Sequence, residues 1–199
     1  GYQVAVVSDA GMPGISDPGQ EVIGQAIKED IEIVVLPGPT ASITALVASG
    51  LPTQKFVFEG FLSSKKKTRI KELENLKDEK RSIIIYESPH RLLSTLKDML
   101  QIIGNRRIVV AREITKVYEE FFRGDISQAV EKFEVSTIRG EFVLIIEGNK
   151  ELKENIDINI KEEIERYLNE GYTKKMSVKI VSEKYNLPKN LVYRQSLKI

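Results

Sequence analysis

The stretch "VVSDAGMPGISDPG" at residues 6–19 joins an apolar run to a helix signal and is dense in turn-forming residues. It holds three glycines, two prolines and two aspartates, which is more than a simple connection requires. The apolar run at residues 3–7 predicts a strand buried on both faces, as in a parallel sheet. Ser16 or Asp17 can cap a helix that has Pro18 in its first turn. We therefore expect a strand, a loop shaped around a ligand and a helix; an ordinary tight turn is the alternative.

The same order of elements recurs directly after this helix. Residues 31–36 predict a second apolar strand, "PGPT" follows it, and an apolar helix at residues 41–49 ends at Gly50. Strands that alternate with helices in this way predict an α/β domain. The segment "GLPTQKF" is typical of a hinge, so we place the first domain at residues 1–54.

A second α/β domain is expected at residues 55–149. Strands are predicted at residues 56–62, 82–86, 107–111 and 142–147. Helices are predicted at residues 65–79, 89–103 and 126–133. Residues 117–122 form a possible further strand, after which "RGD" at residues 123–125 is predicted to turn the chain.

The remaining residues, 150–199, predict a small basic extension without strands. Short helices are expected at residues 158–170, 174–185 and 189–198. Residues 171–199 hold seven lysines and arginines against a single acid, whereas the whole chain has a net charge of only +1. A local basic patch of this kind can bind phosphate groups.

The composition excludes several classes of site. The chain has 199 residues, 41% of them hydrophobic, and contains no cysteine and one histidine. Disulfides, thiolate chemistry and multi-histidine metal sites are therefore excluded, and with no carboxylate cluster we predict no metal. No apolar run reaches the length of a membrane span, and we expect a cytoplasmic protein without a membrane partner. Because an apolar strand follows Gly1 and Tyr2 almost at once, we expect the true start to lie upstream.

Polar or turn-forming residues follow four apolar runs. These are "SDAGMPGISDPG", "PGPT", "ESPHR" and "REITK". If the strands are parallel, the four segments meet at one rim of the sheet, where open α/β sheets bind ligands. The glycine spacing matches neither the phosphate-binding loop nor the dinucleotide fingerprint. Glycine instead lets the backbone lie close to a ligand, and proline fixes the loop before binding.

A further set of segments, taken in order along the chain, resembles a known family. The segments are "VVSDAGMPGISDPG", "LPGPTA", "GLPT", "FEGF", "YESPHRL", "ARE.TK..EE" and "GEFVLIIEG". They are similar to small-subunit ribosomal RNA 2′-O-methyltransferases that modify a cytidine in the decoding region, which have the tetrapyrrole methylase fold. The resemblance covers residues 3–149, and the tail resembles a helix–turn–helix extension of some members. The family's opening segment, with a Gly-Asn-Leu loop and an "EDTR"-like motif, has no counterpart here.

The resemblance implies a two-domain α/β fold that binds S-adenosylmethionine between its domains, with the first domain partial in this chain. It implies cofactor contacts at Gly11, Met12, Pro13, Ile15, Thr40 and Ala41. Thr40 begins a helix, and we expect that positive helix end to face the methionyl carboxylate. Candidates for the adenine side are Ile85, Tyr86, Phe142 and Val143. Asp9 could bond the ribose hydroxyls or, as an alternative, cap local amides in the turn.

For acid–base work the sequence offers Glu87, His90, Glu113 and Lys116. We favour Glu113 and Lys116 as the catalytic pair, with a structural ion-pair network as the alternative. A lysine base would need its pKa lowered by burial or by the positive charge of the cofactor.

The candidate RNA-binding residues are basic and lie in three regions. They are Lys65, Lys66, Lys67, His90, Arg91, Arg112, Lys174, Lys175 and Lys189. The alternative to RNA binding is that the residues of the first two regions are simply solvated at helix ends. For the tail, the alternative is a small helical cap with exposed lysines. The expected partner is small-subunit rRNA or the assembled small subunit, and the fold family implies a homodimer. The competing functions are a small-molecule tetrapyrrole methylase and a catalytically inactive nucleic-acid-binding fragment.

Overall fold

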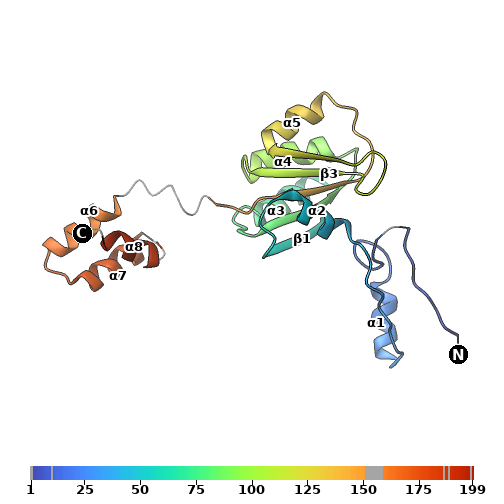
Figure 1. Cartoon of the computed structure of the whole chain (residues 1–199), viewed down its shortest axis with the longest axis horizontal. Helices are drawn as coiled ribbons and strands as arrows, with labels where there is room; N and C mark the ends of the chain where they lie inside the picture. Colours follow the sequence, from blue (N-terminus) through green and yellow to red (C-terminus); the bar gives the residue numbers. More distant parts are fainter. Residues whose placement is uncertain (1, 10, 151–158, 186, 188, 198) are drawn as a thin grey trace. The chain divides into compact units, whose positions relative to one another are not determined.

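The computed structural model describes residues 2–9, 11–150, 159–185, 187, 189–197 and 199. The chain divides into two compact units, Gly1–Lys150 and Glu151–Ile199, and each is described by itself (Figure 1). The boundary predicted between residues 54 and 55 stays a prediction. In the described part, no helix combines the length and the apolar character needed to cross a membrane.

The first unit is built on a mixed five-stranded sheet with the order β1-β2-β5-β3-β4. Its strands are β1 Phe56–Phe61, β2 Ser82–Glu87, β3 Arg107–Arg112, β4 Glu120–Asp125 and β5 Phe142–Ile146. β1 pairs with β2 in parallel, whereas β5 is antiparallel to both β2 and β3. It follows that β1, β2 and β3 run in the same direction, so their carboxyl ends share one edge.

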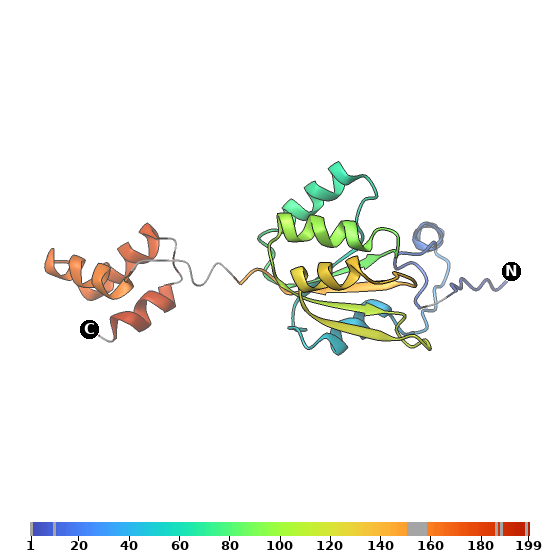
Figure 2. The same ribbon diagram turned by 90° about the horizontal axis from the view of Figure 1, so that it is seen from above.

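Helices cover both faces of this sheet, as Figure 2 shows. One face carries α3 (Lys66–Asn75), α4 (Leu92–Ile102) and α5 (Ile126–Glu134), and the other carries α2 (Ala41–Ser49). Because successive strand residues point to opposite faces, Ile83 and Ile85 pack against the three-helix face while Ile84 packs with α2. This alternation confirms the predicted α/β layering.

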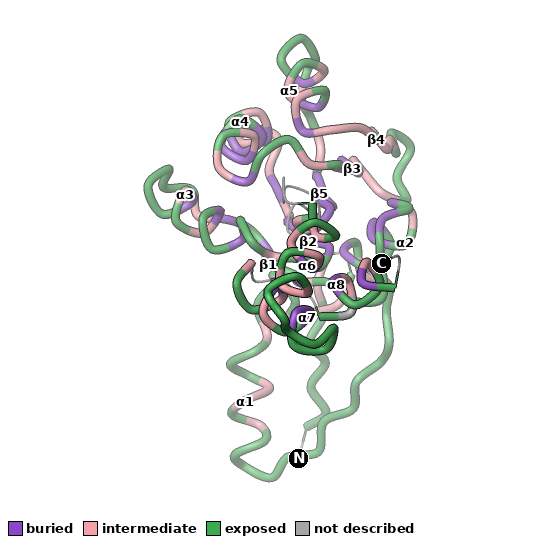
Figure 3. Tube along the Cα trace, turned by 90° about the vertical axis from the view of Figure 1, so that its left-hand side faces the viewer, coloured by how far each residue is buried: buried purple, intermediate pink, exposed green. Residues whose placement is uncertain are grey.

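The apolar runs at residues 3–7 and 31–36 do not form strands, so that prediction is wrong for this structure. Their apolar side chains are exposed, with 84% of Val4 and 79% of Leu36 accessible. Figure 3 shows both segments and the intervening α1 (Gln20–Lys28) as predominantly exposed. Apolar residues indicate a preference for strand, but a strand also needs a hydrogen-bonded neighbour, and none pairs with these segments among the described residues.

The predicted turn at residues 123–125 is also wrong, because these residues complete β4. The chain turns one residue later, where α5 begins. There the Asp125 amide donates a hydrogen bond of 2.9 Å to Gln128 Oε1, which closes the first turn of the helix. The turn-forming composition of "RGD" therefore marked a strand end and a helix cap.

The second unit consists of α6 (Ile160–Asn169), α7 (Lys174–Lys184) and α8 (Lys189–Ser196) around a small core. The core residues are Ile164, Val178, Val181, Leu187 and Val192. Asn159 and Thr173 each accept a hydrogen bond from an amide in the first turn of the following helix. The three predicted helices are confirmed, with observed ends no more than two residues from the predicted ones; the predicted ends at residues 158 and 198 lie outside the described residues.

A buried ion pair joins α3 to α4 in the first unit. Arg69 donates to Asp98 Oδ2 from Nε at 2.9 Å and from Nη2 at 2.7 Å, and both side chains are almost fully buried. Two charges taken out of water in this way depend on each other, because loss of one leaves the other unpaired in a low dielectric.

We expect Asp98→Asn to lower the free energy of unfolding by about 3–5 kcal/mol, since the Arg69 guanidinium then stays buried without a counter-charge. Glu134→Gln is the matched control, because the Lys97–Glu134 pair of similar length is exposed and such pairs contribute about 0–1 kcal/mol. Urea denaturation of both variants measures the difference. Equal losses of unfolding free energy in the two variants would contradict the claim that burial makes the Arg69–Asp98 pair more important than the exposed pair.

Candidate functional site

The shared edge of the sheet brings two of the predicted segments together. The pairing register places Glu87, the last residue of β2, opposite Phe142 of β5. Phe142 is in turn opposite Arg112, the last residue of β3. The segments "ESPHR" and "REITK" therefore begin at one edge, although the strand between them runs the other way. This confirms the predicted convergence for these two segments.

The two glycine- and proline-rich loops of the first 40 residues lie against each other. A Cβ at Gly38 would lie only 3.1 Å from Met12 Sδ, and one at Gly11 would lie 3.5 Å from the Pro39 carbonyl oxygen. Gly11 also has a φ of 77°, a conformation that favours glycine. The absence of side chains at these positions allows the two loops to approach at backbone distance.

The first turn of α2 meets the end of β2. The Ser42 amide donates a hydrogen bond of 3.1 Å to the Tyr86 hydroxyl, across 44 residues of sequence. Thr40 is the N-cap residue, so the positive end of the helix lies at this junction. The rings of Phe58 and Phe61 pack edge-on against Tyr86, with centroids 5.0 and 5.6 Å away. The positive end of α2 therefore lies beside a cluster of three aromatic rings.

A bulge in β1 connects the first loop to the same region. The register between β1 and β2 shifts between Phe58 and Gly60, and Gly60 has a φ of 63°. A Cβ at Gly60 would lie 3.3 Å from Ser16 Oγ. The loop at residues 8–19 therefore contacts both the "PGPT" segment and the end of β1.

The sheet separates the four candidates for the adenine side into two pairs. Tyr86 and Val143 lie on the face that α2 covers, where Val143 packs with Ala45 and Leu46. Ile85 and Phe142 point to the opposite face and are buried in the core beneath α4 and α5. Only Tyr86 and Val143 present side chains toward α2, so the structure does not bring all four together.

The predicted catalytic residues form an ion-pair cluster just beyond β3. Lys116 Nζ lies 3.1 Å from Glu113 Oε1 and 2.9 Å from Glu141 Oε2. Glu113 Oε1 also accepts a 2.9 Å hydrogen bond from the Glu141 amide, and Glu113 has a φ of 48°. Gly140 makes room for this arrangement, because a Cβ there would lie 2.6 Å from Glu113 Cγ.

The cluster moves both pKa values away from those of a proton-transfer pair. The Glu141 amide, helped by Lys116, lowers the pKa of Glu113 below its ordinary value of 4.5. The carboxylates of Glu141 and Glu113 raise the pKa of Lys116 above 10.5. The stabilising effect of Glu113 is thus present above about pH 4.5 and is lost on acidification, while that of Lys116 is present below about pH 10.5 and is lost at higher pH. A lysine base needs the opposite shift.

The basic residues of the first unit fall into two kinds. Lys65, Lys66 and Lys67 are exposed at the start of α3, where the helix dipole disfavours positive charge. His90 is exposed in the turn before α4. Arg91 is engaged internally, donating to the Leu62 carbonyl and lying 3.3 Å from the buried carboxylate of Glu87.

Arg112 is likewise held by the protein itself. Its Nε donates a 2.7 Å hydrogen bond to the Arg139 carbonyl, and its Nη1 lies 3.6 Å from Glu120 Oε2. Arg91 and Arg112 are therefore oriented by the fold, whereas the three lysines and His90 are exposed. Of these, Lys66 also lies with its Nζ 3.8 Å from Asp98 Oδ1.

Sequence reasoning missed three features of the site. Glu141 is a direct partner of Lys116, Gly140 accommodates Glu113, and the Tyr86 hydroxyl accepts from Ser42. No periodicity or spacing marks these contacts, because each joins residues at least 25 positions apart. Gly140, two residues before β5, was the one available signal.

Comparison with known proteins identifies the family. The family model of tetrapyrrole (corrin/porphyrin) methylases matches residues 1–130. Ribosomal RNA small subunit methyltransferase I from Halalkalibacterium halodurans is 48% identical over 198 residues, covering 97% of this chain and 68% of its own length. The chain belongs to the ribosomal RNA small subunit methyltransferase I family. The Bacillus subtilis member is 46% identical over 199 residues, with coverage of 97% and 68%. The family resemblance inferred from the sequence is confirmed.

Solved structures agree on the fold of this family. The methyltransferase CobJ matches with a TM-score of 0.53 and 18% identity, covering 69% of this chain and 62% of its own. Cobalt precorrin-4 methyltransferase CbiF gives a TM-score of 0.50 at 17% identity, with coverage of 64% and 56%. At these identities the likeness establishes the tetrapyrrole methylase fold alone, which confirms the predicted fold class.

We expect Gly140→Ala to displace Glu113 and to raise the pKa of its carboxyl toward the ordinary value, because the carboxylate loses the Glu141 amide. Gly104→Ala is the matched control: Gly104 has a φ of 83° against 91° for Gly140, but open space around it. Left-handed backbone costs both variants about 1–2 kcal/mol, and overpacking costs Gly140→Ala about 1–3 kcal/mol more. Carbon-13 NMR titration and urea denaturation test this, and an unchanged Glu113 pKa in Gly140→Ala would refute it.

Proposed function

We propose that the protein transfers a methyl group from S-adenosylmethionine to the ribose 2′-hydroxyl of a cytidine in small-subunit rRNA. The observation that carries this proposal is the 48% identity to a ribosomal RNA small subunit methyltransferase I along 97% of the chain. The specific nucleotide and the ribose oxygen come from the motif resemblance at residues 3–149. The geometry at the sheet edge supports the proposal.

The residues at the junction of α2 and β2 fit the cofactor. Its carboxylate suits the positive end of α2 at Thr40 and Ala41, where the Thr40 side chain accepts no hydrogen bond from the first-turn amides. Gly11, Met12, Pro13 and Ile15 would lie along the nucleoside, with Asp9 near its ribose. Tyr86 and Val143 are the side chains available to the adenine on the α2 face. When bound, the cofactor supplies an electrophilic methyl group on a sulfonium centre.

Positioning is expected to supply most of the acceleration, because the protein has to align one hydroxyl with one methyl group. Glu113 and Lys116 are the proposed catalytic pair, with roles revised from those of a base. Lys116 is an ammonium at neutral pH, so it can stabilise negative charge on the ribose oxygen as the hydroxyl proton leaves to water. Glu113 holds this ammonium in place. Arg112, anchored to the Arg139 carbonyl, would orient the same strand end.

The exposed cations supply a surface for the RNA backbone. Lys65, Lys66 and Lys67 place three positive charges at the helix end that repels them. Asp98 lies 3.8 Å from Lys66, and an anionic partner would offset the charges that remain. His90 is exposed close in sequence to β2, while Arg91 would act through its hold on Glu87. The partner is rRNA or the assembled small subunit, in the cytoplasm. A homodimer remains an expectation from the family resemblance.

A labelled-methyl assay tests the proposal. We expect the protein to methylate small ribosomal subunits or their rRNA at a cytidine 2′-oxygen, with the Bacillus subtilis relative as positive control. Nuclease digestion that stops at the modified ribose locates the product. Transfer to a tetrapyrrole would favour the small-molecule alternative. Cofactor binding by calorimetry, with no transfer to either acceptor, would identify an inactive protein with an intact cofactor site; no binding and no transfer would refute the enzyme.

A further inference from the structure

The helical unit has a surface hollow that the proposed methyl transfer does not use. The hollow has a volume of about 460 Å³ and is lined by Lys174, Lys175, Val178, Lys189 and Tyr193. Its size falls in the range of ligand-binding clefts, roughly 300–1,000 Å³. α7 and α8 supply all of the lining, so the hollow belongs to this unit alone.

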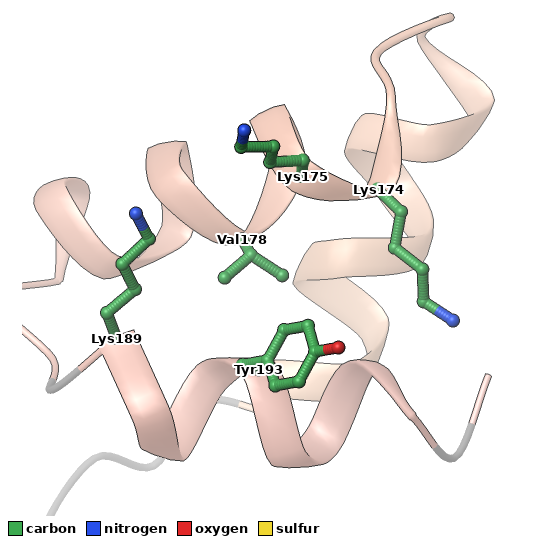
Figure 4. Close-up of a pocket in the computed structure, with 5 residues that line it drawn as sticks. All are labelled: Lys174, Lys175, Val178, Lys189 and Tyr193. Carbon is green, nitrogen blue, oxygen red and sulfur yellow. The ribbon is translucent and has the colours of Figure 1, made fainter.

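The floor and the rim of the hollow differ in chemistry. Figure 4 shows Val178 directed toward the ring of Tyr193, with the ammonium groups of Lys175 and Lys189 on one side and that of Lys174 on the other. Val178 is 2% exposed and anchored in the core, whereas 54% of Tyr193 is accessible. The half-exposed ring of Tyr193 therefore lies beside the buried Val178 and faces solvent between the three lysines.

The three lysines have no internal partner in the described part of this unit. Other cations of the same helices are paired: Lys179 with Glu183, and Lys184 with Glu163. None of Lys174, Lys175 and Lys189 lies within ion-pair distance of a carboxylate among the described residues. Each stands in the first turn of its helix, where positive charge is unfavourable. An anionic ligand would offset both effects.

The geometry points to a single-stranded RNA site in which one unpaired base stacks on Tyr193 while the three lysines hold the phosphates on either side. Stacking on an aromatic face with cations along the backbone is how proteins bind single strands without sequence preference. In an A-form duplex the bases are stacked on each other and their faces cannot reach a ring. The choice of RNA as the ligand rests on the proposed function. In this proposal the helical unit binds an unpaired segment of the RNA.

The chain lacks tryptophan, which provides a direct test. Tyr193→Trp introduces a single tryptophan, which can be excited selectively, at the proposed stacking position. We expect a short single-stranded RNA to quench its emission at low salt, because a stacked base contacts the indole face. Met176→Trp is the matched control: Met176 is 47% exposed and two residues before Val178, so it points to the other side of α7. Its emission should change little.

Affinity measurements on the full chain separate stacking from charge. By fluorescence anisotropy, Tyr193→Ala should weaken single-stranded RNA binding about 5- to 100-fold, and Tyr193→Phe should retain it. Lys189→Gln should reduce the slope of log K against log salt by about 0.7. Undiminished binding by Tyr193→Ala, or a duplex of equal length that binds as tightly and quenches equally, would overturn the inference. Methyl transfer measured on the same variants tests the proposed enzyme activity separately from RNA capture.

Discussion

The position of β5 in the middle of the sheet is the constraint on which the site depends. All five of its residues are apolar and buried, and they pair with β2 on one side and β3 on the other. Since β5 is antiparallel to both, β2 and β3 must be parallel to each other, and their carboxyl ends emerge at the same edge. The burial of this strand therefore places "ESPHR" and "REITK" together, although 25 residues separate the starts of the two strands.

The candidate cofactor region is built largely from main-chain groups. Glycines at positions 11, 38 and 60 allow the loops and β1 to approach one another, and the α2 amides provide polarity without a charged side chain. Prolines at positions 13, 18, 37 and 39 restrict the backbone of these loops, which reduces the conformational entropy lost on binding. Side-chain charge is concentrated instead at Lys116 and its two carboxylates, which lie beyond β3. In the proposed mechanism, the first region binds the cofactor and the second stabilises charge.

Elements supported by local patterns were predictable from the sequence, and contacts between distant segments were not. The apolar helix closed by Gly50 was predicted at its observed bounds, because its start, composition and stop signal are all local. The apolar runs at residues 3–7 and 31–36 show the limit, since strand formation depends on a neighbour that a single run cannot specify. Which face of the sheet Ile85 and Phe142 point to could be known only from the pairing register of β5. The direction in which the pKa of Lys116 shifts could not be predicted, because it depends on Glu141, which is 25 positions away.

The central claim is that the positive end of α2 receives the cofactor carboxylate, and a pair of substitutions at one residue tests it most directly. Thr40→Asp and Thr40→Asn both supply good N-caps, so neither should harm the helix, but only the aspartate repels a bound carboxylate. Calorimetry with S-adenosylhomocysteine should show roughly tenfold or greater weakening for Thr40→Asp and near-native affinity for Thr40→Asn. Equal affinity in the two variants would contradict this placement of the cofactor.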